Sequence, residues 1–441
     1  MVATQLDASL LASLHASAAA SLGDDVAVVF AAAMTRTLDR AVRIDDDGAP
    51  FVLTGDIPAM WLRDSAAQMR PYVAICHLDP ALADLIAGIV RTQARQIIRD
   101  PYANAFNDGP TDAGHIGDLT ARSAWIWERK YEVDSLAFPL QLAYQLWAAT
   151  GRTDHLDEAL VSAARSVIET VRTEQDHPAR SGYSFERLDG PRTDTLVGGH
   201  GSPVAVTGMT WSGFRPSDDA CRYHYNVPGN LFMAQSLRNL AELADGPLAS
   251  PDLAADAVAV AAELEAAVAA HGVVDHPVHG RIWAYEVDGL GHHLLMDDAN
   301  MPSLLSLPLT GGIAVDDPLY RATRSFVLSD DNPTFVRGAT GDGLGSPHTP
   351  DRYVWPIAAA VRGLTSTEPE QRAALLRQLV DVAGPRARMS ESYDVDDPTA
   401  FTREWFSWAD SMFCELVLDE LGHTVPGRRL PAAVESPAAH P

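Results

Sequence analysis

Residues 405–416, WFSWADSMFCEL, carry the clearest periodic pattern in the chain. Their apolar side chains recur at steps of three and four residues, a spacing that places them on one face of an α-helix. The same spacing runs through residues 253–268. Comparable stretches predict further helices over residues 5–20, 24–42, 63–78, 80–98, 134–150, 152–173, 227–243, 316–327, 352–363 and 366–382. Alternating β patterns are scarce, and residues 182–188 and 281–287 are predicted to form small hairpins.

Long polar connections rich in glycine and proline separate these helices. They cover residues 100–120, 175–217, 272–300, 328–350 and 384–402. Loops of this length are uncommon in a compact domain unless they build a binding site. Helices joined by alternately short and long connections fit a toroid of helical hairpins, an (α/α)6 barrel, whose long loops gather at one end. An open helical solenoid is the alternative fold, but the chain has no repeat of fixed period to support it.

Domain boundaries and helix starts follow from composition. No linker divides the chain, so residues 1–425 are predicted to form one domain, and residues 426–441, rich in proline and alanine, a flexible tail. Ser217-Asp218 and Thr367-Glu368-Pro369 are predicted to cap the starts of helices.

Charge and cysteine content exclude several classes of protein. The formal net charge of −26 argues against nucleic acid or an anionic membrane as the main partner, because phosphate binding needs clustered basic residues. No window is apolar enough to span a membrane. Cys76, Cys221 and Cys414 lie far apart, which predicts neither a disulfide framework nor a zinc cluster. The N-terminus lacks the pattern of a secretory signal, so we expect a cytoplasmic protein.

Five segments concentrate the residue types that line sugar sites. Sugar recognition uses aromatic faces against the C–H side of the ring, and carboxylates or guanidinium groups against its hydroxyls. These side chains gather in residues 54–65, 107–135, 211–228, 345–356 and 389–408.

Other chemistries have little support in the sequence. The chain has no G-x-S-x-G elbow, no H-E-x-x-H, no Walker loop and no G-x-G-x-x-G that opens a helix after a strand. His292-His293 and Asp297-Asp298 have no spacing typical of a metal site. No metal or cofactor is therefore predicted, which leaves hydrolysis by two carboxyl groups as the economical mechanism.

Adjacent carboxyl groups at Asp218 and Asp219 allow two interpretations. They can complement the dipole at a helix start. Alternatively, each can raise the pKa of the other by like-charge crowding, as a general acid requires. These arguments do not separate the two residues.

Five strings resemble glycoside hydrolase family 125, in the same order along nearly the whole chain. They are TGDIPAMWLRDSAAQMRPY, WERKYEVDSL, GFRPSDDA, GSPHTP and MSESYDVDDPTAFTREWFSWADSMF. The resemblance implies an (α/α)6 barrel and an exo-acting α-1,6-mannosidase. It also implies inversion, in which one carboxylic acid protonates the departing oxygen and a second carboxylate activates water.

The same resemblance implies the catalytic pair. The acid falls in the S-D-D block and is predicted as Asp219, with Asp218 as the alternative. The base is predicted as Glu391 of the M-x-E-S block, with Glu404 as the alternative. Ser390 stands where the family motif is expected to have histidine.

The predicted partner is a mannose-containing oligosaccharide. Its binding residues are predicted as Asp56, Trp61, Arg63, Asp64, Trp211, Arg215, His348, Trp355 and Arg403. By resemblance Arg63, Asp64 and His348 hold the terminal mannose, and Trp408 is a further candidate for stacking. Two alternatives remain: another (α/α)6 hydrolase acting on α-glucosides or unsaturated uronides, and a catalytically inactive carbohydrate-binding homologue.

Overall fold

The computed structural model describes residues 5–45 and 47–427, and helices dominate it. The helices are α1 (Ala8–Leu22), α2 (Asp24–Ala41), α3 (Leu62–Ala67), α4 (Arg70–Ile75), α5 (Pro80–Arg99), α6 (Val133–Thr150), α7 (Glu158–Glu174), α8 (His177–Arg180), α9 (Val227–Asp245), α10 (Pro251–His271), α11 (Leu307–Thr310), α12 (Pro318–Val327), α13 (Pro356–Leu364), α14 (Pro369–Ala383) and α15 (Ser407–Glu420).

Short strands lie in the connections between these helices. They are β1 (Val42–Ile44), β2 (Pro50–Val52), β3 (Met60–Trp61), β4 (Ala105–Phe106), β5 (Ile126–Glu128), β6 (Tyr225–Asn226), β7 (Val273–His276), β8 (Gly280–Trp283), β9 (Glu286–Val287), β10 (His293–Leu294), β11 (Phe335–Gly338), β12 (Gly341–Leu344), β13 (Tyr353–Val354) and β14 (Tyr393–Asp394). They form small antiparallel sheets, of which β3-β4-β5 and β10-β9-β6 have three strands.

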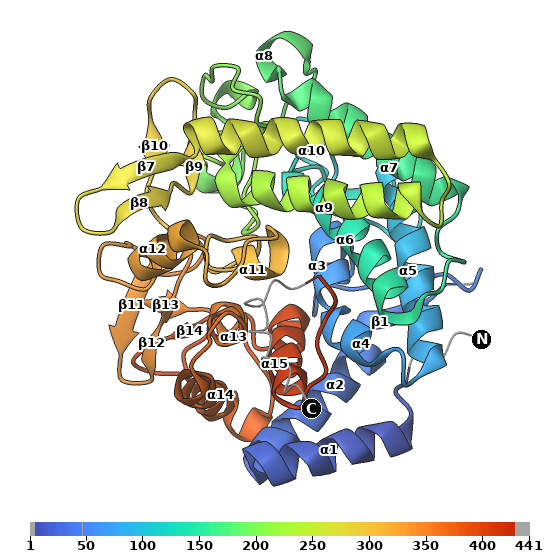
Figure 1. Ribbon diagram of the computed structural model, residues 1–441, viewed down its shortest axis with the longest axis vertical. Coiled ribbons are helices and arrows are strands. Elements are labelled where there is room, and N and C mark those ends of the chain that lie inside the picture. The colour runs from blue at the N-terminus through green and yellow to red at the C-terminus, as the bar shows by residue number, and fades with distance from the viewer. Residues whose placement is uncertain (1–4, 46, 428–441) are drawn as a thin grey trace, which may run out of the picture.

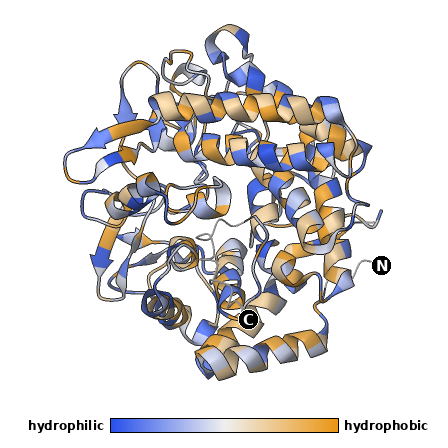
Figure 2. Cartoon of the chain, viewed as in Figure 1, coloured by the Kyte–Doolittle hydropathy of each residue, from blue (hydrophilic) through white to orange (hydrophobic). Residues whose placement is uncertain are grey.

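The helices form two concentric layers (Figure 1). The inner helices α3, α4, α6, α9, α11, α13 and α15 are buried around most of their circumference, whereas the outer helices bury one face. The outer helix α10 is mostly hydrophobic, with scattered hydrophilic residues along it (Figure 2). The last helix, α15, packs against α2, α3, α4 and α13, so the two ends of the chain meet and the ring closes. The predicted (α/α)6 barrel is confirmed.

One continuous hydrophobic core joins both layers. It includes side chains from Leu14 near the N-terminus to Val425 beyond the last helix. Most of the predicted tail, residues 428–441, lies outside the described residues.

Helix boundaries differ from the sequence prediction where proline intervenes. The predicted helix over 63–78 is two short helices, because Pro71 has no N–H for a bond back to the preceding turn. The helix predicted from residue 352 begins at Pro356, after Tyr353 and Val354 pair with β14. Thr367-Glu368-Pro369 does begin a helix, with Glu368 at the N-cap position.

Two β predictions and one helix start were wrong. Residues 182–188 form only one isolated bridge, between Glu186 and Leu119. The 281–287 segment divides between β8, which pairs with β7, and β9, which pairs with β6 and β10. No helix begins at Ser217-Asp218. The next helix, α9, begins at Val227 behind an Asn226 cap whose side chain accepts a hydrogen bond from the Gly229 N–H at 2.8 Å.

Two further sequence expectations concern the membrane and the cysteines. Within the described part of the chain, none of the helices has the length and apolar character needed to cross a membrane. Cys76, Cys221 and Cys414 are all buried and all free.

Candidate active site

A pocket opens where loops lead into the N-terminal ends of inner helices. Its walls come from the connections before α3, α9, α11, α13 and α15, so segments remote in sequence meet at one end of the barrel. The lining residues are Thr54, Ile57, Trp61, Arg63, Asp64, Pro216, Ser217, Asp218, Asn300, His348, Trp355, Glu391, Arg403, Phe406 and Trp408. Its volume is only about 40 Å³.

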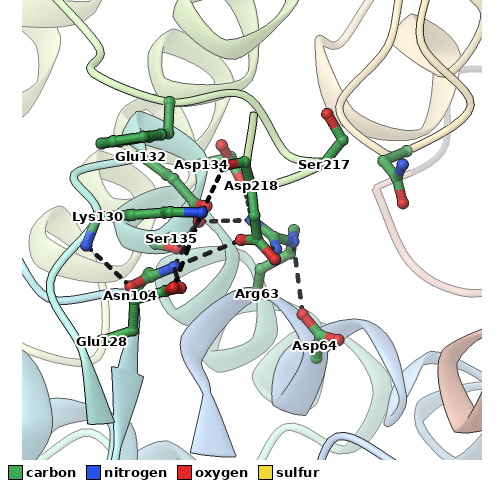
Figure 3. Close-up of polar contacts among 12 residues, drawn as sticks. Arg63, Asp64, Asn104, Glu128, Lys130, Glu132, Asp134, Ser135, Ser217 and Asp218 are labelled. Carbon is green, nitrogen blue, oxygen red and sulfur yellow. Dashed lines mark hydrogen bonds and ion pairs between the residues drawn. The ribbon is translucent and has the colours of Figure 1, made fainter. Parts of the chain in front are cut away.

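Arg63, in the first turn of α3, is surrounded by carboxyl groups (Figure 3). Its Nη1 lies 2.5 Å from Glu132 Oε2 and 3.3 Å from Asp134 Oδ2, and its Nη2 lies 3.1 Å from Asp218 Oδ1. Its Nε lies 3.4 Å from Asp64 Oδ2. Arg63 and three of these carboxyl groups are almost completely buried, whereas the Asp218 side chain is 27% exposed and faces the pocket.

Burial and crowding shift the pKa values of these carboxyl groups. Burial raises the pKa of Asp64 to about 6 and that of Asp134 to about 6, against the opposing attraction of Arg63. Burial also raises the pKa of Glu132 well above its usual value, and the negative charges of Asp218 and Asp134 add to the effect. For Asp218, burial alone would raise the pKa, but Arg63, a hydrogen bond with Glu132 and Lys130 together lower it. The most buried carboxyl groups of this cluster therefore take up protons more readily than Asp218 does.

The carboxyl groups of Asp218 and Asp219 point into different surroundings. Asp218 adopts a left-handed backbone conformation with φ of 66°. The turn is held by a bond from the Asp218 N–H to the Arg215 carbonyl and one from Lys130 Nζ to the Asp218 carbonyl. Asp218 lines the pocket, whereas the buried Asp219 side chain contacts His348 Nδ1 at 3.1 Å through Oδ1.

His348 is held as a cation beside the pocket. Burial by itself would lower its pKa, but the hydrogen bond and charge of Asp219, with the charges of Asp218 and Glu391, raise that pKa to about 9. The protonated ring donates from Nδ1 to Asp219 and keeps its second N–H as a donor. It can therefore donate to a ligand oxygen.

Glu391 enters the pocket from the segment before α15. Its Oε1 lies 3.4 Å from Arg403 Nη1, and its backbone N–H donates to the Arg403 carbonyl at 3.0 Å. Arg403 in turn donates from Nη2 to the Thr54 carbonyl at 2.8 Å and pairs with Asp56. The close approach explains Gly55, where a Cβ would stand 3.2 Å from Arg403 Nη2 and from the Trp405 carbonyl oxygen.

Not every predicted site residue reaches the pocket. Glu404 is 53% exposed and pairs with Arg388. Trp211 is fully buried in an aromatic stack with His177, at a centroid distance of 3.8 Å. Arg215 is buried and donates from Nε to Glu286 at 2.6 Å. Asp56 is exposed and borders the site only through Arg403.

The other predicted sugar-binding residues do line the pocket. They are Trp61, Arg63, Asp64, His348, Trp355 and Arg403, together with Trp408. Sequence reasoning missed several lining residues, including Asn300 and Phe406. It also did not single out Asp134, whose side chain lies against Arg63.

Asp297 and Asp298, considered above for metal binding, tie loops together. Asp298 accepts hydrogen bonds from Ser217 Oγ at 3.1 Å and from Ser346 Oγ at 2.9 Å. It therefore links the loop that carries Asp218 to the loop that carries His348. Asp297 accepts from two backbone N–H groups, and burial raises its pKa to about 8.

Comparison with known proteins identifies the family. The sequence model described as "Metal-independent alpha-mannosidase (GH125)" matches residues 23–418. The chain belongs to this family. The membership predicted from the five sequence strings is confirmed, and the protein is an α-mannosidase.

Two relatives match the sequence of this mannosidase along most of its length. The meiotically up-regulated gene 157 protein of Schizosaccharomyces pombe is 39% identical over 422 residues, which span 90% of this chain and 82% of that protein. A solved metal-independent α-mannosidase of Streptococcus pneumoniae, in a non-productive complex with α-1,6-mannobiose, is 47% identical with a TM-score of 0.91. The match covers 94% of this chain and 97% of that one.

A more distant likeness shows the fold alone. A bacterial glucoamylase complexed with acarbose is 14% identical, with a TM-score of 0.59 over 95% of this chain and 57% of its own. The barrel fold is thus shared with other glycosidases, and the fold alone does not identify a substrate.

Proposed function

We propose that this α-mannosidase is exo-acting, inverts the anomeric configuration and removes terminal α-1,6-linked mannose from oligosaccharides. The observation that carries the proposal is the meeting of two carboxyl groups, Asp218 and Glu391, in one small pocket lined by aromatic and basic side chains. The α-1,6 linkage follows the mannobiose bound by the Streptococcus pneumoniae relative.

Asp218 is the proposed general acid, in place of the Asp219 preferred on sequence. Asp218 lines the pocket and remains partly exposed, so its carboxyl group can reach a glycosidic oxygen. Asp219 is engaged with His348, which it helps to keep protonated. Glu391 is the proposed general base, since it lines the pocket and Glu404 does not.

These roles give a single displacement. Glu391 removes a proton from water as that water attacks the anomeric carbon, and the carboxylic acid of Asp218 protonates the departing oxygen. The bond between the anomeric carbon and that oxygen breaks, and β-mannose leaves. Arg63, Asp64 and His348 are proposed to bind the sugar hydroxyls, and Trp355 or Trp408 to pack against its apolar face.

NMR of the sugar first released from α-1,6-mannobiose tests the proposal. We expect β-mannose to appear before mutarotation, and Asp218→Asn and Glu391→Gln to abolish its release. Initial α-mannose would contradict inversion. An inactive Asp219→Asn beside an active Asp218→Asn would reverse the assignment of the acid. Hydrolysis of α-glucosides instead of mannosides would favour the other (α/α)6 hydrolases.

The cytoplasmic location predicted from the sequence stays a proposal. Fractionation of the producing cells, with a cytoplasmic enzyme as marker, would test it. Recovery of the mannosidase in the medium or in an extracytoplasmic fraction would contradict it.

A further inference from the structure

We propose that Glu132 is a positioning residue for acid catalysis, which shares one proton with Asp218 and aligns its carboxyl group. The inference rests on the acid role proposed above for Asp218. Glu132 lies at the start of α6, and its side chain has no exposed surface. It therefore acts on the reaction through Asp218, without touching the sugar.

The side chains of Arg63 and Asn104 each contact both carboxyl groups, those of Glu132 and Asp218. Arg63 contacts Glu132 through Nη1 at 2.5 Å and Asp218 through Nη2 at 3.1 Å. Asn104 Nδ2 lies 3.4 Å from Glu132 Oε1 and 3.4 Å from Asp218 Oδ1 (Figure 3). Ser135 Oγ also donates to Glu132 Oε2, at 2.8 Å. These bonds fix Glu132 against the acid.

Glu132 and Asp218 thus lie side by side, on the same Arg63 guanidinium and the same Asn104 amide. An ionised carboxylate only accepts hydrogen bonds, so two neighbouring carboxyl groups can bond to each other only when one of them holds a proton. Two carboxyl groups that share one proton are a known device for acid–base catalysis. In this pair Glu132 is buried and Asp218 reaches the pocket.

The surrounding charges require such a proton. Four carboxyl groups, those of Asp64, Glu132, Asp134 and Asp218, face the single guanidinium of Arg63. If all were ionised, three negative charges would be left uncompensated by Arg63 in a buried cluster, and buried groups avoid this state by holding protons. The other charged groups next to the cluster are Glu128, Lys130, Arg187, Asp194, His348 and Arg403.

The proton balance of the step follows from this pair. At rest the two carboxyl groups carry one proton between them. Asp218 delivers this proton to the glycosidic oxygen as the bond to the anomeric carbon breaks, and both carboxylates are then ionised against Arg63. Solvent returns a proton through Asp218, the exposed member of the pair.

Glu132→Gln tests the proposal with substrates of different leaving groups. The glutamine keeps the shape but carries neither the acidic proton nor the charge, so Asp218 beside Arg63 is protonated less often at neutral pH. We expect kcat for α-1,6-mannobiose to fall about 100-fold. The loss for 2,4-dinitrophenyl α-mannoside should be only a few-fold, because dinitrophenolate leaves without protonation. The basic limb of the pH profile of kcat should move to lower pH, and Glu132→Asp should restore part of the activity.

Glu174→Gln is the matched control. Glu174 is another buried glutamate, bonded to His177 and Tyr102, and it does not line the pocket. We expect Glu174→Gln to lower Tm. Any change in kcat should be the same for both substrates. An equal loss for both substrates in Glu132→Gln, with an unchanged pH profile, would overturn the proposal. Asp218→Asn, assayed in parallel, separates the two claims: if it hydrolyses mannobiose normally, the acid assignment itself fails.

A measurement on the wild-type enzyme guards against a variant that fails to fold. Carbon-13 at the glutamate side-chain carboxyl makes each glutamate visible by NMR without interference from aspartates. In the wild-type enzyme we expect one glutamate resonance to remain at the position of a protonated carboxyl group at pH 7. This resonance should be absent from Glu132→Asp and should shift in Asp218→Asn. If every glutamate titrates below about pH 5, near the usual value for this side chain, the shared proton does not exist.

Discussion

Asp218 and Glu391 line the same pocket, but their surroundings differ in charge. Asp218 belongs to a buried cluster in which one guanidinium, that of Arg63, faces four carboxyl groups. Glu391 contacts Arg403, whose side chain is 21% exposed and extends to the exposed Asp56. One side of the pocket is thus rich in carboxyl groups around one guanidinium, and the other is an ion pair whose arginine extends to the surface.

This difference shows how one pocket can divide acid and base roles between two carboxyl groups. A crowded, buried cluster holds protons, as the raised pKa values of Glu132, Asp134 and Asp64 show. A carboxylate beside a partly exposed guanidinium has no comparable crowding and suits a base that must accept a proton from water. Substitutions on the two sides of the pocket should therefore have different effects on kcat and on the free energy of unfolding.

The largest effect is expected from Glu391→Gln. Loss of the base should lower kcat by about 10³–10⁴-fold, and equally for mannobiose and dinitrophenyl mannoside, because water must be activated whatever the leaving group. Steady-state kinetics with both substrates measure this fall in kcat. This equality contrasts with the leaving-group dependence expected on the Asp218 side.

Glu404→Gln is the control for Glu391→Gln. Glu404 is close in sequence and chemically identical, but it is exposed and paired with Arg388. We expect its kcat to stay within about two-fold of wild type, as for a surface substitution. An inactive Glu404→Gln beside an active Glu391→Gln would reverse the comparison.

The next largest effect is expected on stability, from Arg63→Met. Removal of the guanidinium that faces these four carboxyl groups should lower the free energy of unfolding by about 3–5 kcal/mol. The loss should be smaller at pH 5 than at pH 8, because Asp64 and Asp134, with pKa values of about 6, hold protons at the lower pH. Urea denaturation of wild type and Arg63→Met at pH 5 and at pH 8 measures this loss.

Arg403→Met gives the matching measurement on the other side. The Arg403 side chain is partly exposed and its partner Asp56 is 63% exposed, so its ion pairs should contribute only about 1 kcal/mol or less. A loss equal to that of Arg63→Met would show that the two sides do not differ in burial.

The barrel fold, with its long loops at one end, could be predicted because it depends on the periodic spacing of apolar residues along the helices. The steps of three and four in residues 253–268 and 405–416 become α10 and α15, since each helix must bury its apolar stripe. Strands of two residues, such as β3 and β4, have no period to detect. Their pairing depends on contacts distant in sequence.

The site could be predicted only in part, because the choice between neighbours depends on the backbone. Asp218 and Asp219 are chemically identical, and the left-handed turn at Asp218 sends one carboxyl group into the pocket and the other to His348. Trp61 and Trp211 likewise look alike in sequence, but only Trp61 lines the pocket. Burial of this kind is a property of the tertiary structure.

The smallest effect expected is a pH dependence of stability from His348, which interacts with carboxyl groups on both sides of the pocket. Its pKa is about 9 in the folded protein and about 6.5 in an unfolded chain. A raised pKa stabilises the fold fully below pH 6.5, and this contribution disappears as the pH rises through 9. Because 36% of the side chain is exposed, solvent screening reduces it to about 1–2 kcal/mol.

The test compares the free energies of unfolding of wild type and His348→Gln at pH 6 and at pH 9.5. We expect wild type to be the more stable protein at pH 6, and the difference to shrink toward zero at pH 9.5. Asp219→Asn should remove most of this pH dependence while leaving His348 in place, because Asp219 makes the main hydrogen bond to the ring. If Asp219→Asn keeps the full dependence, the charge of His348 is set mainly by Asp218 and Glu391, and Asp219 has no specific part in holding the cation at the pocket.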